Sequence, residues 1–259
     1  MTASPAHKLL TQHPNIVLVS SGKGGVGKTW FSITFSQALA SLGKKVLTLD
    51  GDLGLANIDI QLGLMPENDL GSFISGDVPL DQCITRFDEG GFDIIAGRSG
   101  TGQLAAMTPP QLYELSRSVY DMADQYDTFL IDLGSGIGPM EKHVSSMASH
   151  CLLIVTEDPT SMTDAYAFLK VMRSAVPGFK ASVVINKATS ELAGERTFKT
   201  LQNVSKNFLS YEPELMGIIA QDSKVNDAIR SQSPILTRHP NGDAATAVID
   251  IAKRFVKRD

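Results

Sequence analysis

The sequence predicts an α/β fold, a single doubly wound domain in which helices cover both faces of a mostly parallel sheet. Short apolar runs rich in β-branched residues alternate with helical stretches, which is typical of strands joined by crossover helices. The runs are apolar almost throughout, as expected for strands that are buried on both faces. No internal repeat, low-complexity tract or long Pro/Gly linker divides the 259 residues, so one domain is expected.

Each element is expected from its own pattern. The predicted strands lie at residues 15–20, 45–50, 92–97, 127–132, 151–156, 182–187 and 215–220. The predicted helices lie at about residues 29–42, 109–125, 163–174, 195–208 and 243–257. Residues 1–14 lack the apolar centre of a signal peptide and are expected to form a short, loosely held leader, with the domain at 15–259.

Composition and charge bound the function classes. The net charge of −5 gives no broad attraction for nucleic acid or anionic lipid. No apolar run approaches the roughly 20 residues that span a bilayer, and neither Cys83, Cys151 nor the histidines show metal-ligand spacing. The last predicted helix ends in basic residues, but its apolar stripe favours a core helix over a membrane anchor. That stripe consists of Ala244, Val248, Ile251 and Phe255.

A glycine-rich loop between the first strand and the first helix predicts a nucleotide site. Residues 22–29, GKGGVGKT, fit the phosphate-loop pattern G-x-x-x-x-G-K-[ST] in the required strand-to-helix context. Backbone N–H groups would face phosphate oxygens, Lys28 would reach the β- and γ-phosphates, and Thr29 would bind Mg²⁺. A glycine-rich turn with an incidental lysine is the alternative. The predicted nucleotide-binding residues here are Gly24, Gly25, Val26, Gly27, Lys28, Thr29 and Trp30.

Lys23 is a second lysine, which the general pattern allows but does not require. With it, residues 23–29 read KGGVGKT, which resembles the deviant phosphate loop of the MinD/ParA class of ATPases. The resemblance implies ATP and Mg²⁺ as cofactors, an ATP-dependent homodimer, and a Lys23 that reaches the phosphates held by the partner subunit. Such a cation would stabilise charge that develops on the transferring phosphoryl group. A solvated loop lysine is the alternative.

Two carboxylates follow the second strand. Asp50 ends that strand, and Asp52 lies two residues further on, where it can face the γ-phosphate. The stretch LDGDLGLANIDIQLGL resembles switch I of the family, which implies that Asp52 orients the attacking water beside the metal. Catalytic roles are thus expected for Lys23, Lys28 and Asp52. The alternative for Asp50 is to cap the following turn.

The strand before residue 133 ends in another acid. In DTFLIDLGSGIG, Asp132 ends an apolar strand and a glycine-rich turn follows, as in a Walker B strand with switch II. Asp132 would hold Mg²⁺ through water, and Gly136 would sense the γ-phosphate. Leu133 stands where the family usually has Ser or Thr, which puts fine switch coupling in doubt. A buried strand that ends in an incidental turn acid is the alternative.

Two later loops resemble the parts of the family that contact the base. Asn186 ends the predicted strand in VVINKA, and ligands of open α/β sheets gather at that edge. The family uses this asparagine to read adenine, so Asn186, Lys187 and Asp222 are predicted to bind the nucleotide. Asp222 lies in GIIAQDSKV, where Ala220 replaces the usual proline. A lone loop asparagine is more often a turn residue.

Two stretches resemble the FlhG/FleN branch, also called YlxH, which regulates flagellar number and placement. They are the switch I stretch, which contains Asn57, and TEDPTSMTDAYAFLKVM, in which Asp164 lies on a surface helix. The resemblance makes Asn57 and Asp164 candidates for partner contacts. The alternative for the second stretch is a capped amphipathic helix with Thr163 as its N-cap, and both can be true.

The sequence therefore predicts a cytoplasmic, dimerising ATPase switch, with the cell pole or inner membrane face as a site of recruitment. The expected partners are a flagellar transcription regulator, an FlhF-like GTPase or a basal-body protein, with direct nucleic-acid binding unexpected and membrane association weak or absent. The N-terminal PAHKLLTQHP does not match the D-Q-A-x-x-L motif that activates FlhF, which puts that activity in doubt. Rival functions are a ParA-like partition ATPase on nucleoid DNA, a MinD-type division-site ATPase, and a scaffold that binds nucleotide without hydrolysis.

Overall fold

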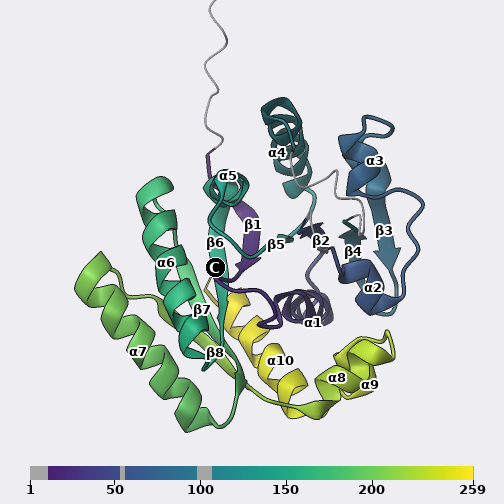
Figure 1. The fold of residues 1–259 in the computed structure, drawn as a ribbon. Coiled ribbons are helices and arrows are strands. Elements are labelled where there is room, and N and C mark those ends of the chain that lie inside the picture. The colour runs from purple at the N-terminus through teal and green to yellow at the C-terminus, as the bar shows by residue number, and fades with distance from the viewer. Residues whose placement is uncertain (1–10, 53–55, 98–106, 259) are drawn as a thin grey trace, which may run out of the picture.

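A computed structural model of the protein describes residues 11–52, 56–97 and 107–258. In these residues, strands form one sheet of eight in the order β3-β4-β2-β5-β1-β6-β7-β8 (Figure 1). The strands are β1 His13–Ser20, β2 Val46–Gly51, β3 Ile84–Phe87, β4 Phe92–Ile95, β5 Thr128–Leu133, β6 Ala148–Val155, β7 Ala181–Ala188 and β8 Glu214–Ala220. The predicted doubly wound α/β class and all seven predicted strands are confirmed.

Edge strand β3 was not predicted from the sequence. It pairs antiparallel with β4, and the side chains of Phe87 and Phe92 meet edge to face beside the turn of this hairpin. Every other pairing in the described residues is parallel. The sequence ITRF of β3 is only four residues long and has two polar residues between its apolar ends, so the pattern of a buried strand is missing.

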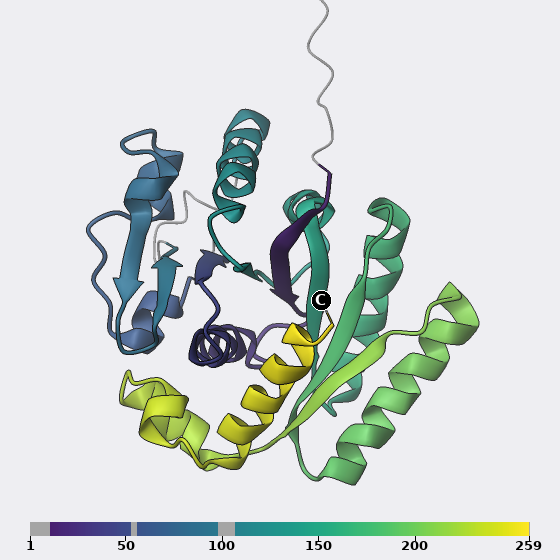
Figure 2. The same cartoon turned by 180° about the vertical axis from the view of Figure 1, so that it is seen from behind.

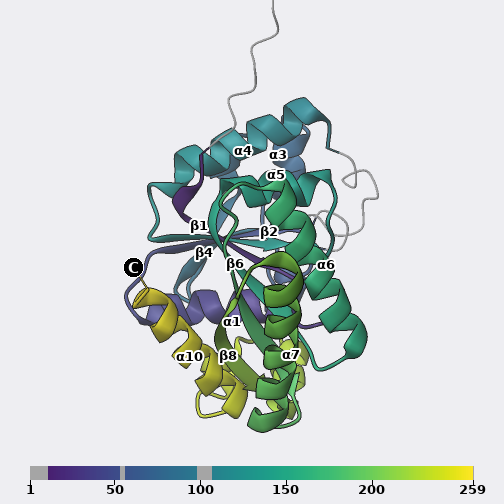
Figure 3. The ribbon, with the colours of Figure 1, turned by 90° about the vertical axis from the view of Figure 1, so that its left-hand side faces the viewer.

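Helices cover both faces of the sheet, as Figure 3 shows edge-on. Along β1, Ile16 and Leu18 face one apolar cluster while Val17 and Val19 face the other, as the two-residue period of a strand dictates. One face carries α3 Leu70–Ile74, α4 Pro109–Ala123, α5 Pro139–Met147, α6 Pro159–Ala175 and α7 Glu191–Leu209. The other carries α1 Lys28–Ser41, α2 Ile58–Leu62, α8 Ser223–Arg230, α9 Ile235–Arg238 and α10 Asp243–Val256.

The five predicted helices are present, and the structure corrects two of their starts. Helix α7 begins at Glu191 rather than at about Glu195, with Ser190 as its N-cap. Helix α6 begins at Pro159 rather than at Thr163, and Asp158 is its N-cap because the Asp158 carboxylate accepts the backbone N–H of Thr160. The short helices α2, α3, α5, α8 and α9 and the 3₁₀ turn η1, Leu80–Cys83, were not predicted. They have fewer than the 10–12 residues from which a helical period can be read.

The last helix, α10, packs its apolar stripe into the core, as predicted. Ala244, Val248 and Ile251 are at most 2% exposed, and Figure 2 shows α10 lying between α1 and β8. The ring of Phe255 meets that of Phe35 on α1 edge to face. No helix in the described part of the chain is both long and apolar enough to cross a membrane.

The sheet order determines where a site can form. Strands β2, β5 and β1 are adjacent, and their register places Asp50 opposite Asp132, with Val19 beside Asp132 on the other side. Because these strands run parallel, their carboxyl ends open on one edge of the sheet, where the loop before α1 also begins. Asp50 and Asp132 are far apart in the sequence, and the crossover connections between the parallel strands bring them to neighbouring positions.

Candidate nucleotide site

The phosphate loop leaves β1 after Ser20 and enters α1 at Lys28. Gly25 and Gly27 adopt positive φ angles of 75° and 92°, a region that side chains rarely occupy. A Cβ on Gly27 would also lie 2.5 Å from Nδ2 of Asn186. Glycine is therefore required at position 27 twice, by the turn and by a neighbour that is distant in sequence.

Asp132 is the hub of the site. Its carboxylate is fully buried at the end of β5 and accepts hydrogen bonds from Lys28 Nζ at 3.3 Å, Thr29 Oγ1 at 2.6 Å and Ser32 Oγ at 3.0 Å. All three donors lie on the first turns of α1. The ammonium group and the two hydroxyls thus compensate the buried negative charge of this carboxylate.

Asp50 is the second buried acid, and the structure gives it the capping role. It accepts the backbone N–H groups of Asp52 at 3.2 Å, Asn57 at 2.8 Å and Ile58 at 3.0 Å, which fixes the start of α2. Burial, with the nearby charge of Asp132, raises the pKa of Asp50 to about 7. Asp50 therefore shapes the loop that carries Asp52 and Asn57 toward the site.

Asn186 and Lys187 hold the phosphate loop from the end of β7. Asn186 is buried and donates from Nδ2 to the carbonyl of Val26 at 2.8 Å, and Lys187 Nζ donates to the carbonyl of Gly25 at 2.9 Å. Lys187 has a positive φ of 57°, which turns its side chain back toward the loop. In this structure both residues position the loop; contact with a base stays a prediction.

Lys23 lies apart from the Lys28 cluster. Its Nζ donates to Asp158 Oδ2 at 2.6 Å and to the hydroxyl of Thr160, at the start of α6. The Lys23 hydrogen bond lowers the pKa of Asp158 to about 2. The two lysines of the loop thus have different partners: Lys28 contacts the buried acid Asp132, and Lys23 contacts Asp158 at the surface.

A hollow of about 280 Å³ lies over the loop. Its walls bring together most of the predicted residues of the loop with Asp52 and Asn57. Asp52 faces switch II, since a Cβ on Gly134 would lie 3.5 Å from its carboxylate. Four lining residues, Ser21, Gln61, Ser135 and Ile229, were not among the predicted site residues. Ser21 directly precedes the quoted loop, Gln61 lies in the quoted switch I stretch and Ser135 lies in the quoted GSG turn, whereas Ile229 lies outside every quoted stretch.

Seven predicted positions lie outside this wall, and three of them, Asp132, Asn186 and Lys187, are described above. The side chain of Asp222 is the N-cap of α8 and also approaches the backbone N–H of Ala244, so it joins two helices. Gly136 has a φ of 154° and lies near the Glu141 carboxylate. Asp164 lies with its backbone against Gly22, and Val26 is buried beneath the loop. Residues 53–55 of the predicted switch I lie outside the described residues.

Leu133, the departure from the family pattern, is buried in the apolar cluster that α4 and α5 cover. It is 1% exposed, and its neighbours include Met140 and Val144 of α5. A hydroxyl at this position would have no polar surroundings in that cluster. Position 133 therefore belongs to the support of the switch turn rather than to its polar surface.

The residues at Asp132 fit a magnesium ion bound with a nucleotide. Mg²⁺ prefers oxygen ligands and is usually held by one or two protein groups together with phosphates and water. Thr29 offers a hydroxyl, and Asp132 and Asp52 offer carboxylates on the same edge of the sheet. Among the described residues no group of three or more His, Cys, Asp or Glu could hold a metal ion. The phosphates of a bound nucleotide would supply further oxygen ligands.

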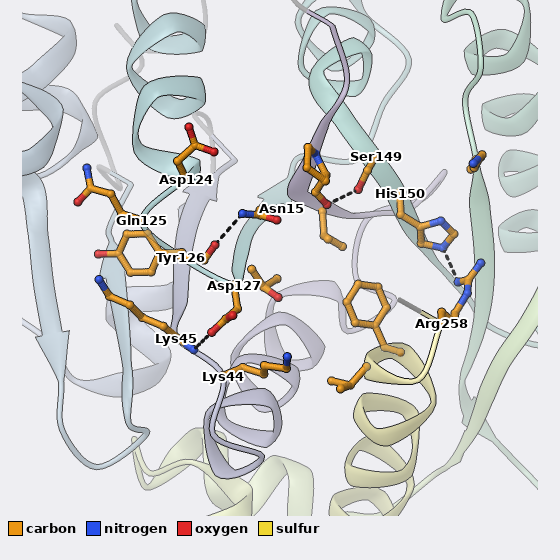
Figure 4. A pocket seen from close by; sticks show the side chains of 16 residues that line it. Asn15, Lys44, Lys45, Asp124, Gln125, Tyr126, Asp127, Ser149, His150 and Arg258 are labelled. Carbon is orange, nitrogen blue, oxygen red and sulfur yellow. Dashed lines mark hydrogen bonds between the residues drawn. The ribbon is translucent and has the colours of Figure 1, made fainter.

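A larger hollow, of about 750 Å³, lies at the opposite edge of the sheet (Figure 4). The side chains of Lys44, Tyr126, His150 and Arg258 surround it at the amino ends of the strands. It contains none of the predicted site residues, no glycine loop and no buried carboxylate pair. The chemistry, rather than the volume, therefore identifies the carboxyl edge as the candidate site.

Comparison with known proteins decides the family. The CobQ/CobB/MinD/ParA nucleotide binding domain matches residues 17–235, a span that contains the phosphate loop and both buried acids. The chain belongs to this family. The predicted resemblance to MinD/ParA-class proteins is thereby confirmed.

Proteins that are similar to this chain include flagellar and cell division proteins. Antiactivator FleN of Pseudomonas aeruginosa is 34% identical over 94% of this chain and 87% of its own length. The flagellum site-determining protein YlxH of Helicobacter pylori is 28% identical over 93% of this chain and 82% of its own. A chain of the MinC:MinD cell division protein complex of Aquifex aeolicus, 26% identical, superposes with a TM-score of 0.78 over 95% of this chain and 97% of its own.

Proposed function

We propose that this MinD/ParA-family protein is an ATP-driven dimerising switch that hydrolyses ATP with Mg²⁺. The observation that carries the proposal is that the two loop lysines differ in their contacts and in their exposure. Lys28 is committed to Asp132 within its own site, whereas Lys23 lies at the surface with its side chain 38% exposed. A surface lysine beside a phosphate loop is available to a second nucleotide site, which only another copy of the chain would bring.

The residues present support hydrolysis by positioning and electrostatics. The N–H groups of the loop, the start of α1 and Lys28 bind the phosphates, and Thr29 and Asp132 hold the magnesium site. When bound, Mg²⁺ supplies positive charge to the β- and γ-phosphate oxygens. Asp52 orients the water whose oxygen attacks the γ-phosphorus, and the bond from that phosphorus to the bridging oxygen breaks. Lys23 of the partner subunit stabilises the charge that develops.

The flagellar role is supported by the relatives FleN and YlxH. The name antiactivator suggests a transcription activator as the partner, and Asp164 on α6 and Asn57 before α2 are our candidate contacts, in a cytoplasmic protein. A MinD-type role in division is the second candidate, because the Aquifex MinD structure matches nearly the whole chain. Deleting the gene and counting both flagella and misplaced septa per cell separates the two roles.

The switch itself is tested with purified protein. Light scattering should show dimers with ATP and monomers with ADP, and a phosphate-release assay should show Mg²⁺-dependent turnover. Glu212→Gln, which breaks the exposed ion pair to Lys206 at the end of α7, serves as a surface control and should behave as wild type. A chain that stays monomeric with ATP at all concentrations would reject the dimerising switch.

A further inference from the structure

The hollow at the amino edge of the sheet gathers cations from three parts of the chain. Lys44 and Lys45 precede β2, Lys180 precedes β7, and Arg258 follows α10. Figure 4 shows Lys45 and Arg258 at opposite ends of the hollow, with Lys44 between them. Four cations and two acids line its walls, in a protein whose net charge is −5. The composition of the chain therefore does not account for this local excess of positive charge.

The two acids of the hollow already have hydrogen-bond partners. Asp127 accepts the backbone N–H of Lys45 at 2.7 Å, and Asp124 Oδ1 lies 3.1 Å from His13 Nε2. Within the part of the chain that the structure describes, none of the three lysines forms an ion pair. Lys45 Nζ lies 4.6 Å from the centre of the Tyr126 ring, a contact that supplies no counter-ion. The lysine charges are thus available to an anion from outside.

Arg258 is a fixed cation at the other end of the hollow. It donates to His150 Nε2 and to Ser182 Oγ, both at 2.9 Å, and it pairs with Glu214 at 3.0 Å. Burial, together with the positive charges of Arg258 and Lys180, lowers the pKa of His150 to about 4. The ring of His150 therefore reports a positive potential at the wall of the hollow, where a bound anion would lie.

We propose that the amino-edge hollow is a docking site for an acidic, extended segment of a protein partner. Its volume of about 750 Å³ is that of a ligand-binding cleft. Carboxylates spaced along such a segment would pair with Lys44 and Lys45 at one end and with Lys180, near His150, at the other. The candidate nucleotide site lies at the carboxyl edge and stays open, so docking here does not depend on the proposed hydrolysis.

The shape of the hollow favours a peptide over a broad anionic surface. A bilayer would meet only the rim of a hollow, and a DNA duplex presents closely spaced phosphates along both strands. Either surface would also bring phosphates close to Asp124, whose side chain is 83% exposed. A single extended chain can enter the hollow and avoid that acid. Charge pairs of this kind mainly steer association and fix the register of the bound segment.

The test measures the binding of a rhodamine-labelled hexaglutamate peptide by fluorescence anisotropy at low salt. Lys44→Ala/Lys180→Ala removes one lysine from each end of the hollow and should raise the Kd about fivefold to tenfold, as expected for two exposed ion pairs. Lys170→Ala/Lys199→Ala removes two exposed lysines, on α6 and α7, and changes the net charge equally. This control should bind the peptide as wild type does. Equal losses in the two variants would mean that only net charge matters and would overturn the docking site.

A second measurement locates the bound peptide. In NMR titrations, unlabelled hexaglutamate should shift the backbone signals of Asn15 and Ser149, which line the hollow, and saturating ADP with Mg²⁺ should leave the Kd unchanged. A Kd that rises with ADP, or shifts confined to the phosphate loop, would place the peptide on that loop and overturn the proposal. Phosphatidylglycerol vesicles or a short DNA duplex might compete; if either bound more tightly than the peptide and lost this binding in Lys44→Ala/Lys180→Ala, the hollow would belong to lipid or nucleic acid instead.

Discussion

The two edges of the sheet differ in what they bring together. At the carboxyl edge, a small hollow of about 280 Å³ is bordered by the loop glycines and by Lys28, whose ammonium group contacts the buried acid Asp132. At the amino edge, a hollow of about 750 Å³ is bordered by basic and aromatic side chains such as Lys44 and Tyr126 (Figure 4). In the part of the chain that the structure describes, only the carboxyl edge brings together a buried ion pair, two loop glycines with positive φ angles and the N-terminus of a long helix. Convergence of such groups identifies a site where size does not.

The edges also perturb protonation in opposite directions. At the carboxyl edge, burial and the charge of Asp132 raise the pKa of Asp50 to about 7. At the amino edge, burial and the charges of Arg258 and Lys180 lower the pKa of His150 to about 4. Each environment disfavours the charged form of the group that it buries. The two edges differ in what surrounds the buried group. Asp50 lies beside the candidate magnesium site, whereas His150 already lies near the cations Arg258 and Lys180.

The largest expected effect comes from the lysine inside the loop. Lys28→Ala removes the ammonium group paired with Asp132 and should reduce ATP affinity by about 100-fold or more, effectively abolishing binding. Lys44→Ala removes an ammonium group at the amino edge and should leave ATP affinity unchanged. Isothermal titration calorimetry of both variants makes the comparison. An equal loss in the two would mean that charge anywhere on the chain suffices, and the assigned site would be wrong.

The next effects separate two residues of the carboxyl edge from each other. Lys23→Ala should still bind ATP, because Lys28 and the loop N–H groups remain, but should stay monomeric and hydrolyse ATP about 10³-fold more slowly. Asp52→Ala should bind ATP and dimerise, then stall with turnover reduced about 10²-fold or more, because water orientation is lost. Light scattering beside phosphate release distinguishes the two. A dimeric Lys23→Ala would leave this lysine no role across the interface.

A matched pair of glycines sharpens the comparison at the level of the backbone. Gly27 and Gly43 have similar φ angles of 92° and 80°, but a Cβ would meet Asn186 at Gly27 and open space at Gly43. Gly43→Ala, at the amino edge, should therefore cost only the local strain of about 1 kcal/mol in unfolding free energy and leave ATP binding intact. Gly27→Ala should cost about 2–4 kcal/mol and reduce ATP affinity at least tenfold. Urea denaturation and calorimetry check both; equal losses of stability would show that the Asn186 contact does not constrain the loop.

The carboxyl edge was largely predictable from the sequence because its signals are local. The loop of residues 22–29 and Asp132 each lie within one strand-to-turn segment, where period and turn chemistry are read directly. Asn186 was expected at this edge as a base reader, yet its bond to Val26, 160 residues away, follows only from the strand order. The same holds for Lys23 and Asp158, 135 residues apart. Contacts between loops of different strands depend on register that no short pattern contains.

The remaining misses have similar causes. Asp222 was assigned to the nucleotide by resemblance, which stays a prediction, and its observed role as the N-cap of α8 and its contact with α10 were not foreseen. Strand β3 was missed because its four residues carry no buried-strand pattern. Thr163 was taken as a helix start, although Asp158 followed by proline is the stronger capping signal. Alternative helix starts lie within a few residues of one another, and short elements contain few residues. Small differences in local preference therefore decide where such elements begin.

The smallest expected effect tests the amino edge and its histidine. Arg258 donates to His150 Nε2 at 2.9 Å, so the neutral ring carries its proton on Nδ1 and protonation would place a cation beside Arg258. The folded pKa of His150, about 4, lies below the ordinary value of 6.5. Between pH 6.5 and 4 the unfolded chain therefore binds a proton that the folded chain does not, and folding stability falls as the pH falls through this window. Because His150 keeps some contact with solvent, we expect a loss of about 1–2 kcal/mol.

His150→Gln lacks the titrating ring, so its unfolding free energy should fall less steeply between pH 6.5 and 4 than that of the wild-type chain. Urea denaturation of the two nucleotide-free proteins across this range measures the difference, and ATP affinity at pH 7.5 should be the same in both. The contribution of Asp50 runs the other way, since its raised pKa makes ionisation cost stability as the pH rises from about 4 to 7. That contribution is common to both proteins and cancels in the comparison. Parallel pH profiles would mean that the amino edge does not shield His150, and a loss of ATP affinity in His150→Gln would mean that the two edges are coupled.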